Sequence, residues 1–154
     1  MLFLKKRKIR KQLAALCDAE RCMPIDIFST SRLIADTNDQ EYCRSLIQQY
    51  GNHANAFVRR AILVAIRYIG GDFPISVREY VSRSLNDTNS WVIYDAAWII
   101  KDFGVASADD LLRLRSLSVE LLNISRSEID NLKPKNPEEY AAKMALQAII
   151  AHQS

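Results

Sequence analysis

Glycine and proline are both scarce in this chain, which has four of each among 154 residues. A β-sandwich or β-barrel needs many tight turns, and a phosphate-binding loop needs several glycines close together, so the composition argues against all three. Long apolar runs are also missing. The longest uncharged apolar stretch, residues 61–66, is far shorter than the roughly 20 residues that span a bilayer. We therefore expect an α-rich fold, no membrane-spanning helix and no membrane partner.

Cysteine and histidine offer little for metal binding or nucleophilic catalysis. The three cysteines, Cys17, Cys22 and Cys43, are odd in number and form no C-x-x-C pair. Because free cysteine packs as a small apolar group, we expect buried thiols. The only histidines, His53 and His152, do not suggest a zinc site or a histidine-dependent hydrolase. The sequence thus predicts no metal and no cofactor.

Acidic residues are absent from the first eleven positions, which hold six basic ones: Lys5, Lys6, Arg7, Lys8, Arg10 and Lys11. The rest of the chain carries 15 basic and 18 acidic residues. A nucleic-acid-binding protein usually spreads its positive charge over the contact face, so nucleic acid is the less favoured partner. We interpret residues 5–11 as a solvated helix face, with a phosphate-rich or acidic partner as the alternative. Apolar residues precede the basic ones, the reverse of a secretory signal, so we expect a cytoplasmic protein.

Apolar residues recur with the period of an α-helix along the whole chain, and no segment alternates clearly enough to predict a strand. We expect an all-α fold in a single domain, residues 1–154. The predicted helices span about residues 4–21, 24–36, 39–50, 54–69, 74–85, 90–103, 108–123 and 137–152. The polar residues 124–136 predict one long loop. Proline and glycine mark several helix ends, and Ser107 with Asp110 resembles a capping pair.

Two segments, residues 52–70 and 86–104, align without gaps at an offset of 34 residues. The matched pairs are Asn52 with Asn86, Asn55 with Asn89, Phe57 with Trp91, Val58 with Val92, Ile66 with Ile100, Arg67 with Lys101, Ile69 with Phe103 and Gly70 with Gly104. So many matches at one offset predict an internal structural repeat.

This repeat resembles the HEAT-like helical repeats, in which Leu-x-Asp precedes a Val-Arg step. Residues 85–92 look like that linker, and Val58 with Arg59 matches the Val-Arg step, although Ile93 replaces the arginine in the second copy. The best-matched repeats lie at about residues 39–70 and 74–104. The resemblance implies a short right-handed α-solenoid of about four helix pairs, each of which needs its neighbours to bury its apolar face.

A helical projection at about 100° per residue separates the faces of the predicted helix 90–103. The predicted core side holds Val92, Ile93, Ala96, Ala97, Ile99, Ile100 and Phe103. The other arc combines aromatic rings with charge and is the candidate partner-binding site: Trp91, Tyr94, Asp95, Trp98, Lys101 and Asp102. The same arc of helix 54–69 holds Phe57, Arg60, Val64, Arg67 and Tyr68, and the two arcs could form one surface. Packing under a neighbouring helix is the competing interpretation, above all for Trp91.

Second helices of HEAT-like pairs line the concave side of the solenoid, where such proteins bind macromolecules. We therefore predict a non-catalytic module that binds one protein partner, such as an adaptor or a cognate inhibitor of the toxin-immunity kind. The alternative is a DNA-directed protein. It would either bind phosphates through residues 5–11 or excise bases, because Trp91 and Asp95 are similar to the Trp-x-x-x-Asp step of HEAT-like alkylpurine DNA glycosylases. That resemblance implies that the carboxylate stabilises positive charge on the sugar as the base leaves.

Overall fold

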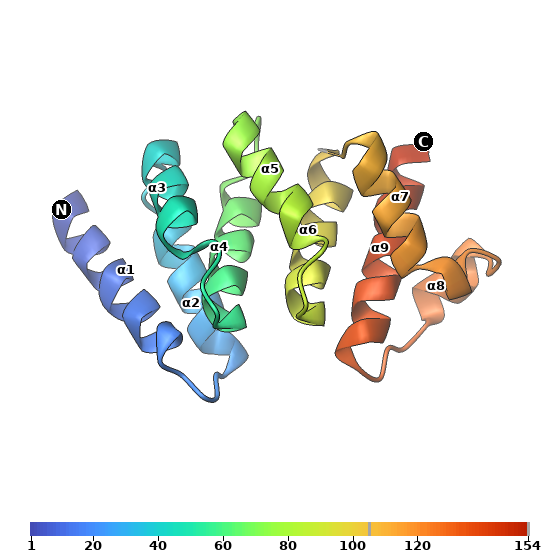
Figure 1. Ribbon diagram of the computed structural model, residues 1–154, viewed down its shortest axis with the longest axis horizontal. Helices are drawn as coiled ribbons and strands as arrows, with labels where there is room; N and C mark the ends of the chain where they lie inside the picture. Colours follow the sequence, from blue (N-terminus) through green and yellow to red (C-terminus); the bar gives the residue numbers. More distant parts are fainter. Residues whose placement is uncertain (105, 154) are drawn as a thin grey trace. The chain divides into compact units, whose positions relative to one another are not determined.

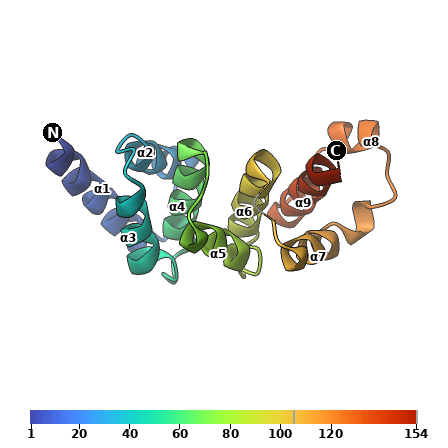
Figure 2. The same cartoon turned by 90° about the horizontal axis from the view of Figure 1, so that it is seen from above.

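The computed structural model in Figures 1 and 2 describes residues 1–104 and 106–153. These residues form helices joined by turns and short loops, and no strand occurs among them, so the predicted all-α class is confirmed. None of these helices has the length and apolar character needed to cross a membrane. The chain divides into two compact units, Met1–Tyr80 and Val81–Ser154. The single domain and the right-handed solenoid stay predictions.

Unit 1 contains α1 (Leu2–Cys17), α2 (Pro24–Ala35), α3 (Gln40–Tyr50), α4 (Ala56–Ile69) and the first part of α5 (Ile75–Ser84). Helix α2 packs along α4, as Figure 1 shows, and α1 contacts both. The apolar faces of these three helices and of α3 form one core: Ile9, Leu13, Leu16, Ile27, Ile34, Tyr42, Leu46, Val58, Ala61, Val64 and Ala65. The buried Ser31 hydroxyl donates to the Ala61 carbonyl at 2.8 Å, which ties α2 closely to α4.

Unit 2 contains the rest of α5, then α6 (Ser90–Phe103), α7 (Ala108–Leu117), the 3₁₀ turn η1 (Val119–Leu121), α8 (Arg126–Asn131) and α9 (Pro137–Gln153). Helix α9 packs along α6 and also contacts α7. The predicted core side of α6 is confirmed, because every member is buried except the half-buried Phe103. Three buried alanines on α9, Ala141, Ala145 and Ala148, keep the side chains facing its neighbours short.

The two copies of the predicted repeat have matching helix ends. The Asn55 side chain accepts from the Phe57 N–H at 2.9 Å, and the Asn89 side chain accepts from the Trp91 N–H at 3.0 Å. Gly70 and Gly104 cap the other ends with φ of 64° and 67°, positive values that glycine adopts without the strain of a side chain, although only Gly104 is in the left-handed helical conformation. Residues 34 apart therefore start and stop both helices.

The long loop predicted for residues 124–136 is wrong, because α8 lies within it. Ser125 and Glu128 form a reciprocal capping box, and the buried Ile129 fixes this short helix to the unit. Two helices end well before their predicted ends at residues 21 and 123: α1 ends at Cys17, and α7 ends at Leu117 before η1 begins. The capping pair of Ser107 and Asp110 is confirmed.

The cysteines only partly match expectation. Cys43 is buried, whereas Cys17 and Cys22 are half-buried. Burial raises the pKa of Cys17 and Cys22 and raises that of Cys43 to about 11. All three are therefore protonated thiols near neutral pH, a form that is a poor nucleophile.

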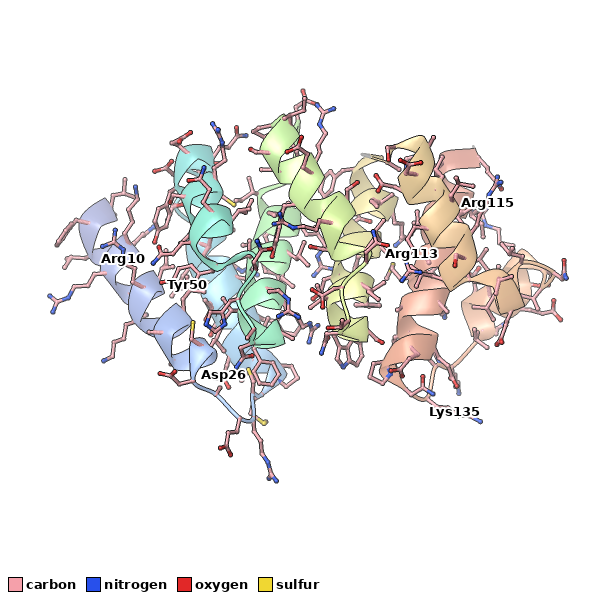
Figure 3. All side chains as sticks on the ribbon, in the orientation of Figure 1. Arg10, Asp26, Tyr50, Arg113, Arg115 and Lys135 are labelled. Atoms are coloured by element: carbon pink, nitrogen blue, oxygen red, sulfur yellow. The ribbon has the colours of Figure 1, made fainter. Side chains whose placement is uncertain are left out.

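One residue of the basic segment, residues 5–11, makes a structural contact that the sequence did not predict. The Lys6 ammonium lies 2.9 Å from Asp39 Oδ2 and 4.6 Å from the centre of the Tyr42 ring, so it joins α1 to the start of α3. The Lys6 hydrogen bond is the main cause that lowers the pKa of Asp39, and the Tyr42 N–H adds to it. Arg7, Lys8, Arg10 and Lys11 are exposed as expected, and Figure 3 labels Arg10.

Overpacking should reveal how tightly α6 is enclosed. Ala96 is 0% exposed, so Ala96→Leu should lower the free energy of unfolding by about 1–3 kcal/mol in urea melts. The control is Ala14→Leu on the exposed face of α1, which should leave stability nearly unchanged. Equal stability of the two variants would contradict the burial of Ala96.

Asp39 should contribute stability in two separable ways. Asp39→Asn keeps an N-cap for α3 and loses the ion pair with Lys6, whereas Asp39→Ala loses both and should cost about 1 kcal/mol more. Because the folded pKa of Asp39 is lowered, its contribution is present above the unfolded pKa and is lost as pH falls through the folded value. Acid unfolding of Asp39→Asn should consequently be less steep than that of the wild type. Superimposable acid-unfolding curves would refute this role.

Candidate protein-binding surface

Four aromatic side chains of unit 2 form a continuous group, here called the aromatic cluster: Trp91, Tyr94, Trp98 and Tyr140. The first three lie on α6 at spacings of three and four residues, which places them on one face. The ring centres of Tyr94 lie 5.5 Å from those of both Trp91 and Trp98, in edge-to-face geometry. Aromatic pairs favour this arrangement, because the positive ring edge meets the negative ring face.

Tyr140 comes from the first turn of α9 and was not among the predicted site residues. Its ring centre lies 5.2 Å from that of Trp91 and 6.1 Å from that of Tyr94. Next to Trp91 in the chain, the Ser90 hydroxyl donates to Glu138 Oε1 at 3.2 Å and joins the starts of the two helices. No repeat or motif in the sequence pairs α9 with α6, so only their packing identifies Tyr140.

The aromatic cluster is neither fully buried nor fully exposed. Trp91, Tyr94 and Trp98 are half-buried, and Tyr140 is 38% exposed. Each of the two sequence interpretations, core packing for Trp91 and exposure for Trp98, therefore describes part of what is found. Rings that brace one another keep few alternative rotamers, while their outer surfaces stay accessible.

Charged groups lie at the end of the aromatic cluster. The Lys101 ammonium is 5.9 Å from the centre of the Trp98 ring, within the range of a cation–π contact, and 3.8 Å from the Asp102 carboxylate. Both charged side chains are about one-third exposed, at 36%. The predicted combination of aromatic rings with Lys101 and Asp102 on one arc is thus present.

The Asp95 side chain is more deeply buried than the sequence predicts. It is only 5% exposed, so the expectation that Asp95 belongs to an open surface is wrong. Asp95 lies one turn from both Trp91 and Trp98, whose wide side chains reach farther from the helix axis than a short carboxylate does. Counting positions around a helix gives the direction of a side chain but not how far its neighbours cover it.

Only some side chains of the predicted arc on α4 are exposed. Val64 is 1% exposed, so including it in an open arc is wrong, whereas Phe57 is half-buried and packs with part of its ring against the core of unit 1. Tyr68 is 40% exposed. The guanidinium carbons of Arg67 and of Arg32 from α2 lie 5.5 Å and 5.2 Å from the Tyr68 ring centre.

The α4 arc thus retains a smaller cationic and aromatic group, with the half-buried Arg60 two turns from Arg67. It belongs to unit 1, whereas the aromatic cluster belongs to unit 2. A single surface formed by both arcs stays a prediction.

Both histidines contact backbone groups. His53 Nδ1 accepts from the Asn55 N–H at 3.0 Å, and His152 Nε2 lies 3.2 Å from the Ile100 carbonyl oxygen. Each of these contacts lies at an end of one repeat helix, so the two side chains have local structural roles. Within residues 1–104 and 106–153, no three or more His, Cys, Asp or Glu side chains group as metal ligands.

No family model, curated protein or solved structure matches the chain. The resemblance to HEAT-like repeats accordingly rests on the residues of the repeat and on their matching helix ends.

The role of Tyr140 can be followed by fluorescence, because the chain has only two tryptophans and both belong to the aromatic cluster. Tyr140→Ala should shift the emission to longer wavelength as water reaches Trp91. A double-mutant cycle between Trp91 and Tyr140 should give a coupling of about 0.5–1.5 kcal/mol. Phe28→Ala removes another ring that is 38% exposed, and it should change neither the emission wavelength nor the coupling between Trp91 and Tyr140. An unaltered spectrum in Tyr140→Ala would disprove the contact.

Proposed function

We propose that this chain is a non-catalytic, helical-repeat protein-binding module and that the aromatic cluster contacts one protein partner. The observation that carries the proposal is the cluster itself, in which four rings from α6 and α9 brace one another and remain partly exposed. Tryptophan and tyrosine dominate binding energy at protein interfaces because each buries a large area with few rotatable bonds.

The cluster suits a partner that buries apolar groups against its rings and meets charge at its rim. Rings held by edge-to-face contacts have already lost much of their rotational freedom, so less entropy is lost when a partner binds. Lys101 and Asp102 place one charge of each sign beside Trp98, which favours a partner with matching charges at its edge. Arg60, Arg67 and Tyr68 of unit 1 are the proposed second contact region.

The architecture that we propose for this module is a short right-handed α-solenoid of HEAT-like helix pairs. The asparagine caps and the positive-φ glycines at an offset of 34 residues support it, since they define the same helical segment twice. An adaptor and a cognate inhibitor of the toxin-immunity kind are both compatible roles for a cytoplasmic protein with such a surface.

Affinity measurements on surface variants test the proposal. A pull-down from the native cell with mass spectrometry identifies the partner, and calorimetry with the purified partner follows. Tyr94→Ala and Trp98→Ala should each weaken binding by about 2 kcal/mol or more, and Asp95→Asn should have a smaller effect. Leu112→Ala, at a residue that is 63% exposed outside the cluster, is the matched control and should bind normally. Wild-type affinity in both cluster variants would rule out this surface.

Base excision is the alternative activity from the sequence, but it requires the Asp95 carboxylate to face a sugar, and this side chain is only 5% exposed. We expect no release of alkylated bases from duplex DNA by the wild-type protein. Release that disappears in Asp95→Asn, with DNA binding retained, would establish the glycosylase alternative in place of the binding module.

A further inference from the structure

The exposed side of α1 combines apolar and basic residues in a way that the proposed function does not use. Ile9, Leu13 and Leu16 face the core of unit 1 and are at most 4% exposed. On the opposite side, Phe3 and Leu4 are 75% and 65% exposed. In Figure 2 the first turn of α1, marked N, lies at the outer edge of its unit.

Positive charge follows these two apolar side chains directly. Arg7 and Lys8 lie one turn after Phe3 and Leu4, Lys11 lies a further turn along, and all three are exposed. Helix α1 contains no acidic residue. The acidic Asp39 and the carbonyl of Asp36 from neighbouring elements face Lys6 and Lys5 on the packed side, so they do not neutralise the outer cations.

We propose that this face of α1, formed by Phe3, Leu4, Arg7, Lys8 and Lys11, docks on an anionic lipid surface. The apolar first turn would enter the boundary between headgroups and acyl chains, and the cations would lie among the anionic headgroups. Helices that bind membrane interfaces bury their apolar side chains roughly 5–10 Å into this boundary.

The exposed apolar side chains of the first turn favour a lipid surface over a nucleic acid. Phosphates of either partner would attract the cations, but only a membrane interface also removes Phe3 and Leu4 from water. The sequence expectation of no membrane partner rested on the lack of a spanning segment, and surface docking needs none. An apolar anchor together with several cations supplies the two signals that stable peripheral binding requires.

Vesicle sedimentation with the full chain tests the proposal. Vesicles of phosphatidylcholine with about 30% phosphatidylserine should bind the protein, whereas pure phosphatidylcholine vesicles should not. Phe3→Gln with Leu4→Gln, and separately Arg7→Gln with Lys8→Gln and Lys11→Gln, should each reduce partitioning about tenfold or more. Glutamine is a good helix former and every changed side chain is exposed, so circular dichroism should match the wild type.

Matched controls lie in unit 2. Leu112→Gln with Val119→Gln changes two apolar side chains that are 63% and 61% exposed, and Arg126→Gln with Lys133→Gln and Lys135→Gln removes three exposed cations. Both variants should bind vesicles like the wild type. Absence of binding to anionic vesicles would overturn the proposal. A second result would also overturn it: vesicle binding that persists in the Phe3→Gln, Leu4→Gln variant together with equal affinity for a DNA duplex. That result would indicate a general polyanion-binding site.

Discussion

The close packing of α9 along α6 is the interaction on which unit 2 depends. Alanines at 96 and 97 on α6, and at 141, 145 and 148 on α9, are all buried, so both helices present short side chains within the unit. Small residues allow helix backbones to approach closely, and ridges of larger neighbours then fill the grooves. The same packing brings Tyr140 to Trp91 and Tyr94, so the proposed binding surface exists only while α6 and α9 are paired.

Helix positions were predictable from the sequence because they depend on local chemistry. Asn55, Asn89, Gly70 and Gly104 act on atoms within a few residues of themselves, and their pattern repeats visibly. The short helix α8 was not predicted because a segment with a capping box and one buried isoleucine is too short to show helical periodicity. Local signals also could not indicate that Lys6 pairs with Asp39, a residue 33 positions away.

The sequence predicted which side chains of the candidate site share one face of α6 but not how deeply each side chain is buried. Spacing on α6 correctly grouped Trp91, Tyr94 and Trp98 with Lys101, since all of them share one helix. Tyr140 could not be added, because its partners are set by the packing of α9. Asp95 and Val64 were wrongly placed on an open surface for a related reason: coverage depends on every neighbouring side chain, and a single helix does not specify those neighbours.

Fluorine NMR of protein labelled with 5-fluorotryptophan tests most directly whether the aromatic cluster is the partner-binding surface. The chain has only two tryptophans, Trp91 and Trp98, so two resonances report on the cluster without background. Our account predicts that adding the purified partner shifts or broadens both resonances in proportion to complex formed, because the partner covers the rings. Complex formation that leaves both resonances unchanged would contradict it and would place the interface elsewhere on the chain.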